Sequence, residues 1–265
     1  MIPRYVNMGD REAIGLVTCI VIQPGGCVEL LSSSIATRVG APDPLRLTVD
    51  GGFDADFTTA GQDYTFNTLN QLDTTNPFTV VWEAELDTFT SSYPAVFSNY
   101  RNVVNSAMTI AYSNAADYKD VLVGHKSPNS KMRFEMHSGL VPTAQRHWGV
   151  FSHTGGTISS SASYMWINGI ALTPFASGDY GNFPDETGIG HESTNNRFDG
   201  AIRQVRVYNY AWDADLALRF YDPSTRDSLY KHERRTRSFG ITTAGGFQSA
   251  WARNSNSILG AGMGL

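Results

Sequence analysis

The residues that could carry out chemistry include an acidic pair in the stretch WEAEL. Glu83 and Glu85 stand two positions apart, so on a β-strand both side chains lie on one face. Enzymes that hydrolyse glycosidic bonds use two carboxylates about 5–10 Å apart, a separation that this spacing permits. The E-x-D-x-x-E pattern of β-sandwich glucanases is absent. We therefore interpret the pair as part of a solvated outer face, and glycosidase activity is the third hypothesis for this chain.

A second acidic group could bind calcium. The stretch DGGFDADF contains Asp50, Asp54 and Asp56 beside two glycines, and carboxylate oxygens are ligands that Ca²⁺ prefers. The residue order of an EF-hand loop is absent, and aspartates that form turns explain these positions equally well. We expect no metal and no other cofactor, and calcium stays open as the alternative.

Histidine, serine and cysteine show no spacing typical of catalysis or of zinc binding. The six histidines form neither H-x-H nor H-E-x-x-H, and the sequence has no G-x-S-x-G turn. A two-residue turn at Pro24 and Gly25 would place Cys27 opposite Ile22 and not opposite Cys19, which disfavours a disulfide. We expect two reduced thiols, no catalytic residue and hence no enzyme.

The elements that position these residues are predicted to be short strands. Of the 265 residues only 17% are charged, against about 25% in average soluble proteins. The stretch 77–89 alternates with period two, which indicates a half-buried strand with one apolar face formed by Phe78, Val80, Trp82, Ala84 and Leu86. The dipeptide Asn168-Gly169 indicates a tight hairpin. More than ten such strands predict an all-β, two-sheet antiparallel sandwich, and only 212–221 has helical spacing.

The order of motifs resembles the laminin-G-like and pentraxin-like branch of the concanavalin-A-like lectin superfamily. The motifs are AIGLVTCIVI, LTVDGGFDADF, PFTVVWEAEL, RHWGVFSHTGG with SYMWINGIAL, and the closing stretch IGHESTNNRFDGAIRQVRVYNYAWDAD. The resemblance implies a jelly-roll sandwich over residues 13–222. Relatives often carry an acidic residue where Arg203 stands, which weakens any metal site taken from them. Alternation in the closing strand predicts that Arg203 shares a face with Val205 and Val207, opposite to Ile202.

The loops offer candidate sugar ligands. Exposed aromatic side chains beside amides are typical of lectin sites, and such residues occur in SNYRN, YGNF and ESTNNRF. The candidates are Asn99, Tyr100, Tyr180, Asn195 and Asn196. Trp82, Trp148 and Trp166 lie inside predicted strands, and we expect them in the core.

The two ends of the chain differ from the sandwich. We expect an N-terminal arm at 1–12 and a C-terminal docking arm at 223–265, where the sequence becomes polar and then rich in glycine. This tail resembles those of tailed-bacteriophage virion proteins, which implies docking to another virion subunit through Phe247, Trp251 and Arg253. The resemblance implies a structural or adhesive virion protein that decorates the capsid or belongs to the tail or a fibre, forms a homo-oligomer and binds host glycans. The alternative is a lectin outside a virion, with or without calcium.

Net charge and hydropathy limit the partners. The formal net charge is −5, whereas nucleic-acid binders show a basic excess, so nucleic acid is not an expected partner. No apolar run reaches the length of about 18 residues that a membrane span needs. The first residues do not resemble a secretory signal. We therefore expect assembly in the host cytoplasm and residence in the virion.

Overall fold

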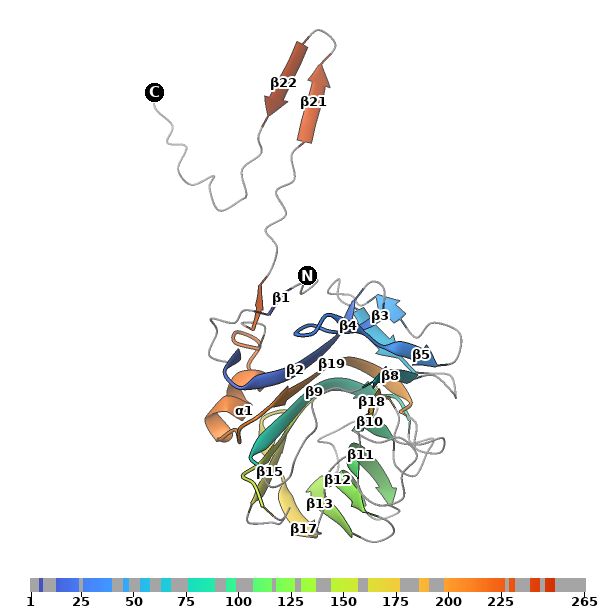
Figure 1. Ribbon diagram of the computed structural model, residues 1–265, viewed down its shortest axis with the longest axis vertical. Coiled ribbons are helices and arrows are strands. Elements are labelled where there is room, and N and C mark those ends of the chain that lie inside the picture. Colours follow the sequence, from blue (N-terminus) through green and yellow to red (C-terminus); the bar gives the residue numbers. More distant parts are fainter. Residues whose placement is uncertain are drawn as a thin grey trace. The chain divides into compact units, whose positions relative to one another are not determined.

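The protein is described by a computed structural model of residues 1–265 (Figure 1). The described residues are 5–6, 13–23, 26–39, 45–47, 53–57, 63–67, 76–88, 94–98, 107–115, 118–126, 130–136, 144–156, 162–176, 186–190, 198–226, 229–231, 239–243 and 246–250. The chain divides into two compact units, Met1–Lys231 and His232–Leu265. The boundaries expected from the sequence, 13–222 and 223–265, stay predictions.

Two large antiparallel sheets make up most of the first unit. The eight-stranded sheet runs in the order β17 (Thr173–Ala176), β13 (Ser130–Met136), β12 (Tyr118–Lys126), β11 (Ala107–Ala115), β10 (Ala95–Ser98), β18 (Glu186–Ile189), β8 (Asp63–Asn67), β5 (Thr37–Val39). The ten-stranded sheet runs in the order β16 (Ile170–Ala171), β15 (Ser163–Ile167), β14 (Arg146–His153), β9 (Phe78–Leu86), β19 (Gly200–Tyr208), β2 (Leu16–Gln23), β3 (Gly26–Glu29), β4 (Ser34–Ile35). The expected all-β sandwich is confirmed.

The remaining strands are short. In the ten-stranded sheet β7 (Phe53–Asp56) pairs with the first half of β19, and β6 (Leu45–Leu47) pairs with β7. Near the ends of the first unit β1 (Tyr5–Val6) pairs with β20 (Tyr230–Lys231). The second unit contains a hairpin of β21 (Phe239–Thr243) and β22 (Gly246–Ala250).

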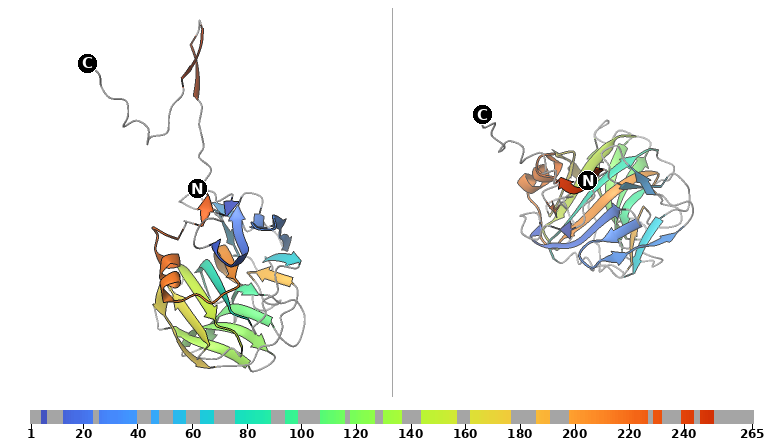
Figure 2. Two further views of the ribbon diagram at one scale, coloured as in Figure 1. Left: turned by 60° about the vertical axis from the view of Figure 1, so that its left-hand side comes forward. Right: turned by 90° about the horizontal axis from the view of Figure 1, so that it is seen from above.

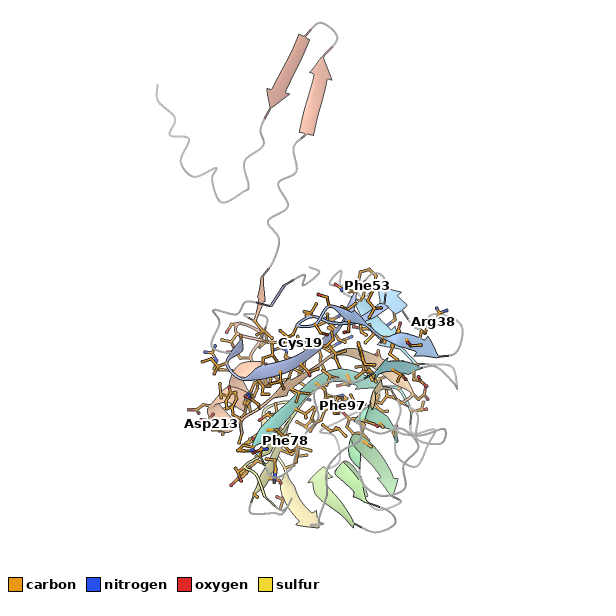
Figure 3. The ribbon with its side chains drawn as sticks, in the orientation of Figure 1. Cys19, Arg38, Phe53, Phe78, Phe97 and Asp213 are labelled. Carbon is orange, nitrogen blue, oxygen red and sulfur yellow. The ribbon has the colours of Figure 1, made fainter. Side chains whose placement is uncertain are left out.

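The chain crosses between the two sheets at both lateral edges. Buried Leu172 links β16 to β17, and half-buried Ala36 links β4 to β5. Each pair of linked strands lies at the same end of the two strand orders, so the sandwich is closed along both sides. The main core fills the space between the sheets, where Phe78 of one sheet and Phe97 of the other both lie (Figure 3). All five residues predicted for the apolar face of β9 belong to this core.

A second apolar cluster covers part of the outer face of the ten-stranded sheet. Most of its residues come from that sheet and from α1 (Ala214–Tyr221), whose Leu216, Ala217 and Phe220 are buried, and the others are Ala13, Trp212 and Leu229. The helix begins at Asp213, whose side chain accepts a hydrogen bond from the backbone N–H of Leu216 at 2.9 Å. Figure 2 shows the helix at one side of the sandwich, and it packs against β14. In the part of the chain that the structure describes, no helix has the length and hydropathy needed to cross a bilayer.

Local turns follow the sequence predictions. In the β15–β16 hairpin both turn residues have positive φ, 51° at Asn168 and 77° at Gly169, as a tight turn of this kind requires. In the β2–β3 hairpin Cys27 pairs with Ile22, and both cysteines are buried and free. These two predictions are confirmed.

Candidate functional site

Most of the residues predicted to bind a ligand or a partner lie outside the described residues. These are Asn99, Tyr100, Tyr180, Asn195, Asn196, Asp50, Trp251 and Arg253. Phe247 lies in β22, where its backbone pairs with Thr242. The candidate sites that the structure does describe lie on the outer face of the ten-stranded sheet and in the core beneath it.

A carboxylate–arginine network occupies the part of the outer face near β6, β7, β9, β14 and β19. It consists of Arg46, Asp54, Asp56, Glu83, Glu85, Arg146 and Arg203. Because these strands are adjacent in the sheet, residues that are far apart in the sequence come within reach of one another. The sequence predictions named the acidic residues and Arg203 but did not bring them together.

A β-bulge in β19 turns Arg203 into this network. From Ile202 to Gln204 the chain of β19 advances two residues while β9 advances one, from Ala84 to Glu83. Ile202 therefore packs in the core with Val205, and Arg203 lies on the outer face together with Gln204. The prediction that Arg203 shares a face with Val205 and Val207 was wrong, because strict alternation fails at a bulge.

Asp54 and Glu83 are the buried centre of the network. Asp54 has no exposed surface, and its Oδ1 accepts a hydrogen bond from Nε of Arg203 at 2.9 Å. Its Oδ2 accepts another from Nη2 of Arg146. Glu83 is 4% exposed; its Oε1 lies 3.2 Å from Nη1 of Arg146, and its Oε2 accepts a hydrogen bond from Nε2 of Gln204 at 2.7 Å. The prediction of a solvated outer face at Glu83 was wrong, because arginine side chains from neighbouring strands cover it.

The network continues through polar contacts to the chain after α1. Nε of Arg206 donates to Oε1 of Gln204 at 2.9 Å, and its Nη2 donates to the carbonyl oxygen of Arg226 at 3.3 Å. Arg206 is completely buried, and its guanidinium carbon lies 5.1 Å from the centre of the Phe220 ring. The charged and the apolar parts of the outer face are thus joined by one buried arginine.

The contacts in this network limit its chemistry. A glycosidase needs one carboxylate free to attack and one able to donate a proton, whereas both oxygens of Glu83 and both oxygens of Asp54 are already engaged. Among the described residues no group of three or more histidine, cysteine, aspartate or glutamate side chains could hold a metal ion. The network therefore acts on the structure as a charge-paired cover of the sheet.

Asp56, a partly exposed carboxylate of the network, is less well compensated than Asp54 and Glu83. Burial raises the pKa of Asp56, and the charges of Glu85 and Asp54 raise it further, while Arg46 at 3.1 Å opposes them. Burial likewise raises the pKa of Asp87, which directly follows the end of β9 and lies two residues after Glu85. At this end of the network one arginine, Arg46, lowers the pKa values of Asp56 and Asp87, whereas Glu85 and other nearby carboxylates raise them.

A buried polar relay joins the two sheets inside the core. Nε1 of Trp82 donates to the hydroxyl oxygen of Tyr112 at 2.8 Å, and this hydroxyl donates to Nε2 of His147. Nδ1 of His147 lies 3.4 Å from the carbonyl oxygen of Gln145, which can only accept, so the proton of the neutral ring sits on Nδ1. Burial lowers the pKa of His147 to about 4 despite the contact with Gln145, and burial raises that of Tyr112. The relay is therefore neutral at pH 7.

An exposed surface of aromatic and aliphatic side chains lies beside α1. Tyr164 on β15 is 46% exposed, Leu218 is 49% exposed and Tyr221 is 39% exposed. The ring of Tyr164 stacks on Trp166 with 6.2 Å between ring centres and 25° between planes. We call Tyr164, Trp166, Leu218 and Tyr221 the helix-side aromatic surface. The sequence analysis missed it, although alternation in SYMWI places Tyr164 on one face with Trp166.

The three tryptophans predicted for the core lie at different depths. Trp82 is completely buried and Trp166 is 8% exposed, which confirms the prediction for these two. Trp148 is half-buried on the outer face. Its ring lies 4.1 Å below the guanidinium carbon of Arg226 and contacts the edge of Tyr221. Trp148 thus packs against Tyr221, one of the residues of the helix-side aromatic surface.

Comparison with solved structures shows the same fold in proteins of very different sequence. Domain 4 of AbnA, an extracellular GH43 arabinanase from Geobacillus stearothermophilus solved with arabinotriose, is 14% identical with a TM-score of 0.59, and the match covers 78% of this chain and 98% of that domain. The receptor-binding domain of botulinum neurotoxin D is 11% identical with a TM-score of 0.57, over 78% of this chain and 52% of that chain.

The binding domain of botulinum neurotoxin DC, solved in complex with SialylT, is 11% identical with a TM-score of 0.55, over 85% of this chain and 53% of that chain. This chain thus spans about half the length of the toxin domains. No protein-family model and no curated protein sequence matches it. At these identities the likeness shows the fold, an antiparallel β-sandwich, and confirms that part of the sequence-based resemblance.

Removing the half-buried Arg146, which bridges the two buried carboxylates, should show how much the network contributes to stability. We expect Arg146→Met to lower the free energy of unfolding by about 2–4 kcal/mol, because it leaves buried carboxylates short of a partner. The matched control is Arg46→Met, since Arg46 also contacts Asp54 but its side chain is 37% exposed; we expect a loss below about 1 kcal/mol. Urea unfolding measures both, and equal losses would contradict a buried, cooperative network.

The relay in the core should make the fold sensitive to acid. The folded-state pKa of His147, about 4, lies below the ordinary value of 6.5, so the neutral ring contributes stability that is fully present above pH 6.5 and is lost as the pH falls towards 4. This loss is on the order of 3 kcal/mol. We expect His147→Gln, which still accepts from Tyr112 but does not titrate, to lose less stability between pH 6.5 and 4. If the free energies of unfolding of the two proteins fell by the same amount between pH 6.5 and 4, His147 would not be the cause of the acid sensitivity.

Proposed function

We propose that this protein is a non-enzymatic, glycan-binding β-sandwich that belongs to a bacteriophage virion. The observation that carries the glycan-binding part is the extent of the structural match. Almost all of a domain solved with arabinotriose, 98% of its length, superposes on this chain. A binding domain of botulinum neurotoxin DC with the same fold is described in complex with SialylT, and cell entry of botulinum neurotoxin type C is described as dependent on interaction with two ganglioside molecules. Carbohydrate recognition thus recurs among sandwiches of this shape.

The contacts of the carboxylates support a binding role without catalysis. Glycosidases keep a proton donor and a nucleophile at the substrate, and their pKa values are set apart by the environment. In this chain Glu83 is held by Arg146, Arg203 and Gln204. Proton transfer by Glu83 would require this network to open. A binding surface requires no such change.

The virion part of the proposal rests on the C-terminal sequence. Residues 232–265 form a unit separate from the sandwich, and the described part of this unit is the β21–β22 hairpin. A two-stranded hairpin alone is marginally stable in water, so a partner that packs on it would stabilise it. We propose that Phe247, Trp251 and Arg253 contact another virion subunit, either of the capsid or of the tail, and that the chain forms a homo-oligomer in the particle. The alternative is a lectin outside a virion.

A glycan array with the full-length protein tests the binding function. We expect binding to one class of glycan that persists in the presence of a chelator, and no release of reducing sugar from the bound glycans. Glu83→Gln with Glu85→Gln serves as the catalytic control. Because Glu83 belongs to the buried network, circular dichroism must first show that the variant is folded, and the folded variant should bind as the unmodified protein does. Absence of binding to every glycan would refute the function, and hydrolysis that disappears in the double variant would make the protein an enzyme.

Deletion of residues 240–265 tests the virion role. We expect the shortened protein to be missing from purified particles assembled in the host, because the proposed docking residues are removed. Circular dichroism of the isolated shortened protein should show an unfolding transition like that of the full chain, since the two large sheets lie in Met1–Lys231. Normal incorporation of the shortened protein would contradict the docking role.

A further inference from the structure

The exposed face of α1 meets the β15–β16 turn. A methyl group at Gly169 in this turn would lie 3.0 Å from Cδ1 of Tyr221 and 3.3 Å from Cδ2 of Leu218. The turn therefore rests against both side chains, and the absence of a side chain at Gly169 leaves room for them. Both Leu218 and Tyr221 nevertheless keep more than a third of their surface in solvent.

The same hairpin carries Tyr164 at its other end. Tyr164 and Trp166 point to the outer face, because Met165 and Ile167 between and after them lie in the main core. Trp166 packs in the same cluster as Leu216, Ala217 and Phe220 of α1. Tyr164 and Asn168 are four positions apart, a distance of about 13 Å along the strand. The surface is therefore a strip along one side of the helix, with an exposed tyrosine near each end.

We propose that the helix-side aromatic surface binds an uncharged oligosaccharide, with Tyr164 and Tyr221 each stacking against the apolar face of a sugar ring. This inference rests on the glycan-binding function proposed above and names its site and ligand class. Flat aromatic rings fixed from below bind such faces at low cost in side-chain entropy. Trp166 fixes Tyr164, and Trp148 contacts Tyr221 edge to face with 6.0 Å between ring centres. The length of the strip requires an oligosaccharide to reach both rings.

The charges along the strip favour an uncharged ligand. Asp213, Asp215 and Asp222 are exposed at the ends of α1. A backbone hydrogen bond from Ser224 lowers the pKa of Asp222, so this group stays ionised at neutral pH. Figure 3 shows Asp213 at the start of the helix, on the outside of the sandwich. Arg219 and Arg226 lie close enough to Asp222 to lower its pKa, and Arg226 also stacks on Trp148. The strip thus has three carboxylates and two guanidinium groups beside it. These groups can hydrogen-bond to sugar hydroxyls, but their charges nearly cancel and give an ionic sugar little net attraction.

The small area of the strip argues against a second protein as its occupant. An aromatic side chain buries about 150–250 Å² when it is fully covered, and a stable protein interface buries about 1,200–2,000 Å². Two tyrosines and one leucine, each about half exposed, provide only a fraction of that area. The strip matches the size of a small polar ligand with apolar faces.

Calorimetry with full-length variants tests this site. The probes are arabinotriose, maltotriose and cellotriose as neutral trisaccharides, and sialyllactose as their charged counterpart. We expect Tyr164→Ala and Tyr221→Ala each to weaken binding of the preferred neutral probe roughly tenfold, while Tyr164→Phe keeps the ring and most of the affinity. The matched control is Ile35→Ala, because Ile35 is 69% exposed on β4, at the far edge of the same sheet. We expect it to bind as the unmodified protein does.

The outcomes separate the site from the function. If the unmodified protein binds none of the probes and no glycan on the array, the proposed function fails. If it binds a neutral probe and both tyrosine variants bind equally well, the function stands and this site is wrong. Preference for sialyllactose would overturn the assignment of an uncharged ligand. If light scattering showed that the tyrosine variants have a different oligomeric state while their affinity for the probe is unchanged, the strip would be an interface between copies of this chain.

Discussion

The pairing of Asp54 and Glu83 with arginines is the interaction on which the outer face of the ten-stranded sheet depends. Removing a carboxylate from water costs several kcal/mol unless charged partners and hydrogen bonds replace the water. Here Arg146 bridges both carboxylates, and Arg203 reaches Asp54 because a bulge in β19 turns it outward. The bulge thus turns Arg203 toward Asp54 and so helps to stabilise two buried charges in the middle of a sheet.

The same sheet is covered in two different ways along its length. Near α1 the cover is apolar, and the buried Trp212, Phe220 and Leu229 pack on Val81 and Val150. Near β7 the cover is the carboxylate–arginine network, and Arg206 joins the two parts through Gln204 and the backbone of Arg226. Most side chains of both covers are buried or half-buried against one another. The tyrosines at the border of the helix remain exposed, and we propose this border as the place of recognition.

The sequence predicts the features of this fold that depend on neighbours in the chain. The period of β9 indicated its core face, and the Asn168-Gly169 dipeptide indicated its hairpin. The bulge at Arg203 could not be predicted, because a bulge is a relation between two paired strands and leaves the local pattern unchanged. The burial of Glu83 was missed for the same reason: its partner Arg146 is 63 positions away. Tyr164 shows the opposite case. Its face of the strand could be predicted from the alternation, but its exposure depends on which distant elements cover that face.

The most direct test of this account is a crystal structure of the full-length protein with the neutral trisaccharide that it binds most tightly. The account predicts sugar rings over Tyr164 and Tyr221, an unchanged carboxylate–arginine network, and no displacement of Arg146 from Asp54. A sugar bound at Glu83, with Arg146 or Arg203 moved aside, would contradict the central claim that this network is a structural cover and that the helix-side aromatic surface is the binding site.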